Sequence, residues 1–157
     1  MSTRYQQLRR CVVRLAAPSE EQVAYLDSIF RHMTVDGNAT EYGNDELALE
    51  FDDIFGASRD MIDHGELSAS ERSALVPLDD LLQKGSGEEN AEFWLRSSLA
   101  NDPRWREVRR VAAEALARLP DEQRAIGRSA SRPLSTHSQT SRFTLTRTAV
   151  CPNITVA

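Results

Sequence analysis

The residues of this chain that could do chemistry are the carboxylates between Asn44 and Gly65, in the run NDELALEFDDIFGASRDMIDHG. A helix would gather three of them on one side, because Glu46, Glu50 and Asp53 follow one another at steps of four and three residues. Carboxylate oxygens so placed can bind a divalent cation or attract a basic protein surface. The predicted partner-binding residues are the acids Glu46, Glu50, Asp52, Asp53, Asp60 and Asp63.

A metal site is the less favoured interpretation of these acids. The stretch lacks the glycine-containing loop of an EF-hand. Metal sites in helical bundles also need inward carboxylates from several helices, typically with a Glu-x-x-His motif. We therefore predict no metal ligand and no cofactor, and we keep a carboxylate-based metal-binding protein or enzyme as the alternative. A merely solvated acidic face is the plainest interpretation.

Signatures of catalysis are absent from the sequence. It has no phosphate-cradling glycine loop, no G-x-S-x-G, no H-E-x-x-H and no zinc-type cysteine pair. The histidines, His32, His64 and His137, are far apart, and Cys11 and Cys151 lie near opposite ends without metal-ligand spacing. No catalytic residue is predicted, and the two cysteines are expected to be ordinary free thiols.

Charge is distributed unevenly along the 157 residues, although the net charge is only −5. Residues 18–122 carry all 24 acids against 10 bases, whereas residues 1–17 carry four arginines and residues 123–157 carry five arginines, both without an acid. An acidic body repels nucleic acid phosphates and attracts basic surfaces. The predicted partner is therefore a basic protein.

The element that must position the acids is a helix over residues 45–64. Its apolar residues recur at helical spacing, with Asn44 as N-cap and Gly65 just past the end. The predicted core face consists of Leu47, Phe51, Ile54, Phe55, Ser58, Met61 and Ile62. We expect this helix to be the centre of the core as well as the binding surface.

Further helices are predicted on both sides of this central helix. Amphipathic spacing predicts helices over residues 4–17 and 20–33, with a loop over 34–43. Serines followed three residues later by Gln or Glu predict capped helix starts at Ser19, Ser68 and Ser86, and Asp102 before Pro103 predicts another. Pro77 is expected to kink or split its helix near Val76.

The predicted fold is all-α: a small antiparallel bundle of five to six helices over residues 1–122. Residues 123–157 are rich in Ser, Thr and Arg and are predicted to be a disordered tail. Within that tail, FTLTRTAV alternates as an edge strand would.

Arginines in the last predicted helix support a second alternative, a helical regulator that contacts nucleic acid. The arginines are Arg104, Arg106, Arg109 and Arg110. Their acidic surroundings argue against binding to phosphates, so nucleic acid is not the predicted partner.

The chain resembles a group of small acidic helical bacterial proteins of uncharacterised function. The resemblance covers about residues 5–120 and is carried by the runs DELALEFDDIF, Gly65-Glu66-Leu67, LDDLL, GSGEENAEFW and DPRWREVRRVAAEALARL. In size and acidity this group is similar to immunity proteins that neutralise bacterial toxins. The resemblance implies a helical domain that acts by protein–protein neutralisation, and it transfers no site residues.

The sequence thus predicts a non-catalytic protein-binding module, of the immunity type, that docks onto a basic toxin or partner through an acidic helix face. No apolar run approaches the roughly 20 residues of a membrane span. The apolar run after the first arginines is too short for a secretory signal, so a cytoplasmic location is expected. The oligomeric state is left open by these patterns.

Overall fold

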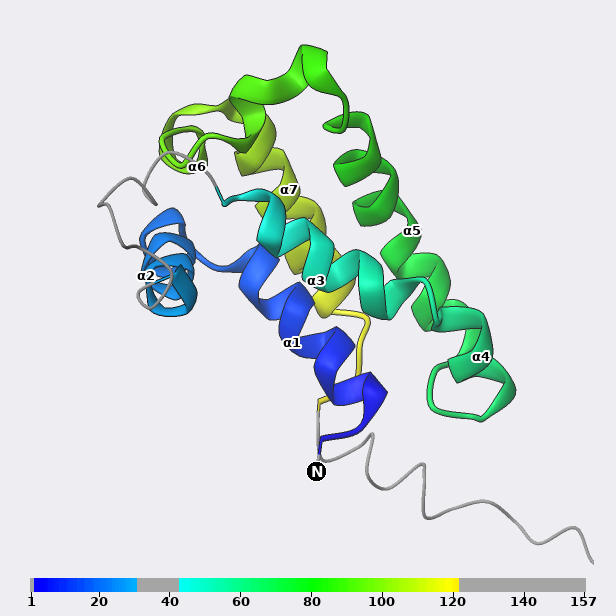
Figure 1. Ribbon diagram of the computed structural model, residues 1–157. Coiled ribbons are helices and arrows are strands. Elements are labelled where there is room, and N and C mark those ends of the chain that lie inside the picture. The colour runs from blue at the N-terminus through cyan, green and yellow to red at the C-terminus, as the bar shows by residue number, and fades with distance from the viewer. Residues whose placement is uncertain (1, 31–42, 122–157) are drawn as a thin grey trace, which may run out of the picture.

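The computed structural model describes residues 2–30 and 43–121, and every regular element in these two ranges is a helix (Figure 1). In chain order the elements are α1 (Arg4–Ala16), α2 (Ser19–Phe30), α3 (Asp45–Phe55), α4 (Ser58–Asp63), α5 (Ala69–Lys84), the 3₁₀ helix η1 (Glu88–Trp94), α6 (Ser98–Asn101) and α7 (Pro103–Leu116). The predicted all-α class is confirmed. The predicted tail over 123–157, and all but the last residue of the predicted loop over 34–43, lie outside the described residues.

Two helix starts follow the capping chemistry that the sequence predicts. The Ser68 hydroxyl accepts from the backbone N–H of Glu71, and the Glu71 carboxylate accepts from the backbone N–H of Ser68 at 2.7 Å, which completes a capping box. The Asp102 carboxylate accepts from the backbone N–H of Arg104 at 2.8 Å, with Pro103 in the first turn. These local signals fix where α5 and α7 begin.

The predicted central helix over 45–64 is wrong as a single element, because the chain breaks it into α3 and α4. At the break the N–H of Ala57 bonds the carbonyl of Ile54 at 3.1 Å, and the N–H of Met61 then resumes regular bonding to Ala57. Gly56 occupies the break, where a residue with poor helix propensity favours the change of direction. Gly65 follows α4 with a φ of 71°, as its predicted position past the helix end requires.

The capped helix start predicted at Ser86 is also wrong. Gly87, with a φ of 104°, takes the N-cap position without a side-chain hydrogen bond, and η1 is a 3₁₀ helix. η1 brings Phe93 into the core, where its ring stacks on Trp105 with centroids 4.7 Å apart. Tertiary packing therefore overrides the capping signal at Ser86.

α5 passes through Pro77 as one helix, so the predicted split near Val76 does not occur. Proline removes one backbone hydrogen bond from a helix. Here its ring lies on the exposed side, while Leu75 and Leu78 are fully buried on the other side of α5. Core packing by these leucines keeps the helix continuous.

The predicted capping box at Ser19 is replaced by a link between α1 and α2. The buried Gln22 amide donates to the carbonyl of Arg14 at 3.0 Å and to that of Leu15 at 3.2 Å. These carbonyls belong to the last turn of α1, where the carbonyl of Arg14 also accepts from the backbone N–H of Ala17 at 3.2 Å. Gln22 thus fixes α2 to the end of α1 across the break at Pro18.

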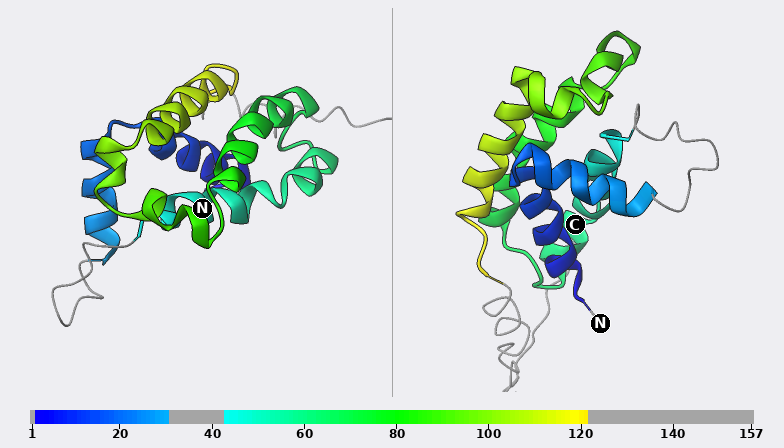
Figure 2. Two further views of the ribbon diagram at one scale, coloured as in Figure 1. Left: turned by 90° about the horizontal axis from the view of Figure 1, so that it is seen from above. Right: turned by 90° about the vertical axis from the view of Figure 1, so that its left-hand side faces the viewer.

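Helices α1, α3, α5 and α7 form an antiparallel bundle (Figures 1 and 2). α1 packs closely against α7 and α3, and α5 packs against α7. The hydroxyl of Tyr5, near the start of α1, donates to the carbonyl of Pro120, just past α7, at 2.8 Å. This contact places the start of α1 beside the end of α7, as antiparallel neighbours require.

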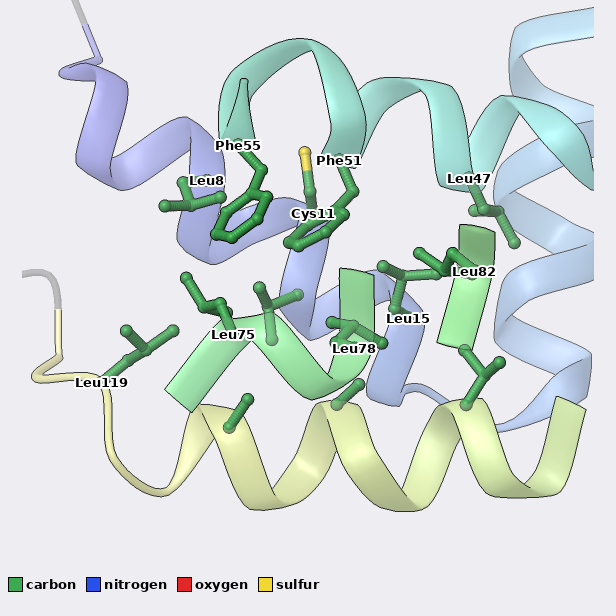
Figure 3. Packing of buried hydrophobic residues seen from close by; sticks show 14 of the residues in the cluster. Leu8, Cys11, Leu15, Leu47, Phe51, Phe55, Leu75, Leu78, Leu82 and Leu119 are labelled. Carbon is green, nitrogen blue, oxygen red and sulfur yellow. The ribbon is translucent and has the colours of Figure 1, made fainter. Parts of the chain in front are cut away.

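Figure 3 shows the core that these helices share: Leu8 and Leu15 of α1, Phe51 of α3, and Leu75 and Leu78 of α5 point toward one another. All five are fully buried. Among the described helices, α3 and α5 do not pack closely against each other. A groove is left between them, and it is bounded at one end by η1.

Candidate functional site

The six acids predicted to bind a partner do not form one continuous surface. α3 carries Glu46, Glu50, Asp52 and Asp53, whereas α4 carries Asp60 and Asp63 beyond the break. Asp52, Asp53, Asp60 and Asp63 are exposed, and Glu46 and Glu50 are half-buried.

The Glu50 carboxylate links three helices within the chain. It lies 2.5 Å from the Arg14 guanidinium and accepts a hydrogen bond from the Tyr25 hydroxyl. The same guanidinium lies over the Tyr25 ring, 4.1 Å from its centroid. Burial and then the neighbouring Glu50 raise the pKa of Tyr25 to about 12. Glu50 joins α1, α2 and α3, so its carboxylate is already occupied within the chain.

Asp60 is likewise partnered within the chain. Its carboxylate pairs with the Arg4 guanidinium, which also bonds the Glu66 carboxylate at 2.7 Å. His64 lies 3.3 Å from Asp60 on the same helix. The hydrogen bond from Arg4 lowers the pKa of the Asp60 carboxyl. An exposed pair of this kind contributes little stability, but it reduces the negative charge that α4 presents.

A groove between α3 and α5, with η1 at one end, is the main hollow beside these acids. It has a volume of about 680 Å³. Its lining is Asp45, Ala48, Leu49, Phe51, Asp52, Asp79, Leu82, Gln83, Ser86, Gly87, Glu88, Ala91 and Trp94. We call this the α3–α5 groove. Its lining is apolar along the floor and acidic at the rim, and it includes no lysine or arginine.

The acidic rim of the α3–α5 groove comes from three elements. Asp45 and Asp52 belong to α3, Asp79 to α5 and Glu88 to η1. Burial raises the pKa of the Asp79 carboxyl, and the charges of Asp52 and Asp80 raise it further. The groove is therefore a region of negative potential, in which an added positive charge would relieve the repulsion.

A smaller hollow adjoins this groove and shares Asp52, Asp79 and Gln83 with it. Arg72 lines this second hollow, donates to the Ser58 hydroxyl at 3.0 Å and lies over the Phe55 ring. Positive charge thus lies beyond the α4 end of the α3–α5 groove, and the groove itself stays acidic.

Sequence reasoning found Asp52 but missed the partners that make it part of a groove. Asp79 and Trp94 lie on separate elements, and only the fold brings them to α3. One local signal was available: Leu49 is apolar but lies outside the spaced core face of Leu47 and Phe51. Its side chain is 50% exposed.

Arg104, Arg109 and Arg110 of α7 have partners within the chain. Arg104 bonds the Asp102 carboxylate and the Asn90 side chain. Arg109 donates to Gln22 at 3.1 Å and to the carbonyl of Leu99 at 3.0 Å, and burial lowers its pKa.

Arg110 pairs with Glu107 and Glu114 on the exposed side of the same helix. The intramolecular partners of the α7 arginines thus lie on α7 itself and on the segments packed against it.

Within residues 2–30 and 43–121, no group of three or more His, Cys, Asp or Glu side chains is arranged to hold a metal ion. None of the helices in these ranges is both long enough and apolar enough to cross a membrane.

Comparisons with protein-family models, with curated proteins and with solved structures find no match to the chain.

Proposed function

We propose that this chain is a non-catalytic protein-binding module, of the immunity type, that neutralises a basic toxin or other basic partner through the acidic side of α3. The observation that carries the proposal is the neighbourhood of Asp52. It is exposed on α3, and it lies across the groove from Asp79, whose carboxyl pKa is raised partly by the Asp52 charge. The nearby Arg72 opposes part of this effect. Carboxylates placed close together in this way favour a cationic partner.

Two of the six predicted acids have a different role in this proposal. Glu50 and Asp60 already bond arginines of α1, so they orient the acidic side and contribute less to a partner. Asp52 and Asp53 are the adjacent exposed acids of α3. The recognition surface therefore centres on this pair.

Charge reversal tests the proposal. Asp52→Lys/Asp53→Lys should abolish capture of a basic protein from a lysate of the source organism, with the full chain as bait. Because complementary charges accelerate association and are screened by salt, capture by the unaltered chain should also fall at high ionic strength.

The matched control is Glu20→Lys/Glu21→Lys, which makes the same change of charge at adjacent exposed acids on α2. The control bait should capture the same protein as the unaltered chain. Equal capture by the α3 variant and the control, with helicity unchanged in both, would contradict the proposal.

A further inference from the structure

The α3–α5 groove has an apolar floor that an acidic surface alone does not require. Leu49 and Val13 are the exposed large hydrophobic residues of the described chain, and Leu49 lies in this groove. Ala48 lies beside it, and its small side chain leaves room next to Leu49. Large apolar side chains on a surface mark interaction sites when they gather in a hollow.

One wall of the groove is held in position before anything binds. The Trp94 indole N–H donates to the carbonyl of Gly85 at 2.8 Å. Its ring meets Phe93 edge-on, with centroids 4.6 Å apart, and Phe93 in turn stacks on the buried Trp105. A rigid aromatic wall reduces the entropy lost on binding.

The charge of the groove selects the kind of occupant. Its rim holds Asp45, Asp52, Asp79 and Glu88, and its lining includes no basic residue. A second copy of this chain would bring another acidic surface, because residues 18–122 carry 24 acids against 10 bases. Like charges in such a contact are destabilising, so a partner with basic residues fits the rim better.

The length and shape of the groove select the fold of the occupant. The part of α3 that lines the groove runs from Asp45 to Asp52 and is about 12 Å long at 1.5 Å per residue. Two helices bound the long sides, and an amphipathic helix laid between them buries one apolar face through residues at i, i+3 or i+4, and i+7. About two turns of helix match this length.

We propose that the α3–α5 groove binds a basic amphipathic helix of a partner protein, with the apolar face of that helix on Leu49 and Trp94 and its lysines or arginines against the acidic rim. This inference rests on the proposed function and identifies the partner segment that the acidic side recognises. The apolar contacts provide an anchor, and the rim acids orient the helix and accelerate its association.

The test uses the full chain and a labelled synthetic 18-residue peptide with leucines at i, i+3, i+7 and i+10 and arginines or lysines at most other positions. A peptide of the same composition, scrambled so that no apolar face forms, is the first control. Fluorescence anisotropy should show at least tenfold tighter binding of the amphipathic peptide, because only that peptide can place leucines and cations on the correct sides.

Two groove variants and one matched control locate the site. Leu49→Ala should weaken binding about tenfold by removing the anchor, and Ala48→Trp should do so by filling the space beside it. Val13→Ala removes the other exposed large apolar side chain, on α1, and should leave binding unchanged. Equal binding by Leu49→Ala, Ala48→Trp and Val13→Ala would overturn the inference.

Other occupants would give different results. If the chain binds the peptide only after the five arginines of residues 123–157 are replaced by glutamine, the groove is already occupied by its own C-terminal segment, and the inference is overturned. Concentration-dependent dimerisation lost in Leu49→Ala would overturn it in favour of a second copy.

The two proposals fail separately. If Asp52→Lys/Asp53→Lys abolishes lysate capture while Leu49→Ala and Ala48→Trp leave peptide binding intact, the proposed function stands and the groove inference fails. If both groove variants lose the peptide while Asp52→Lys/Asp53→Lys retains capture, the groove binds basic helices but the acidic pair does not determine the partner.

Discussion

Glu50 shows how one carboxylate can be structural on a helix that otherwise presents acids outward. It meets Arg14 of α1 and Tyr25 of α2 at a half-buried position. Removing one member of such a set leaves the other polar groups poorly solvated, and that loss exceeds the net value of the bond itself. Another carboxylate three positions along the chain, that of Asp53, is exposed and has no such role in the fold.

At this scale we predict that Glu50→Ala lowers the free energy of unfolding by about 1–3 kcal/mol, because Arg14 and Tyr25 lose their shared acceptor. Asp53→Ala should change it by less than about 0.5 kcal/mol. Urea denaturation followed by circular dichroism measures both. A Glu50→Ala loss no greater than that of Asp53→Ala would show that the carboxylate contributes nothing to the packing of α1, α2 and α3.

The same site has an expected pH dependence. Tyr25 has a pKa raised from 10.0 to about 12, so the folded protein keeps its proton at a pH where the unfolded chain loses it. The stability that this provides is complete below about pH 10 and is lost as pH rises toward 12. In Glu50→Ala this alkaline loss should start at the same pH but be smaller and end at a lower pH, because the hydrogen bond and charge of Glu50 no longer raise the pKa of Tyr25.

At the scale of the helices, local sequence signals predicted the helix starts that depend on neighbouring residues. They did not predict features that depend on contacts between distant segments. The starts of α5 and α7 follow from Ser68, Glu71 and Asp102, because each cap is made by residues within three positions. The 3₁₀ form of η1 depends on Phe93 reaching Trp105, 12 residues away. Rules based on residue spacing within one helix do not predict that contact.

The α3–α5 groove could not be predicted from the sequence for the same reason. Asp52 was identified among the acids of α3, but Asp79 comes from α5, and the wall formed by Trp94 comes from η1. Helical periodicity predicts which face of a helix is apolar, but it does not predict which pair of neighbours will remain apart. α3 packs closely against α1 and α5 against α7, so α3 and α5 have their main contacts with different helices.

Two serines with the same sequence signature give a matched prediction at this scale. Ser68 forms a complete capping box, whereas Ser86, also followed three residues later by Glu, forms none. Ser68→Ala should therefore lower the free energy of unfolding by about 1 kcal/mol, and Ser86→Ala should change it by less than about 0.5 kcal/mol. Thermal unfolding of the two variants measures the difference. Equal destabilisation would show that Ser86 has a capping role after all.

At the scale of the whole molecule, the helices differ in how firmly they are held. α1 and α7 form the most extensive contact, and α1 buries Leu8, Val12 and Leu15 completely. α2 fully buries only Gln22 and Leu26, and the apolar residues of its second half, Ile29 and Phe30, are only partly buried. Segments with few buried apolar contacts open at lower free energy than the core does.

We therefore predict that native-state hydrogen exchange is at least about tenfold faster in the second half of α2 than in the middle of α1 and α7. The comparison is restricted to amides that are hydrogen-bonded within helices. A difference in exchange rate therefore does not come from amides that lack a hydrogen bond. Uniform protection across α1, α2 and α7 would instead show that the described residues unfold only as one unit.

The two sides of α3 differ in how freely their residues can be substituted during evolution. Leu47, Phe51 and Phe55 hold the helix in the core, whereas Ala48, Leu49 and Asp52 face the α3–α5 groove. Substitutions at exposed groove positions cost little stability, because surface changes away from the core usually stay within about 0.5 kcal/mol. Under the proposed function, mutation can therefore change the choice of partner through a few interleaved codons of one helix, while the codons between them stay under selection for folding.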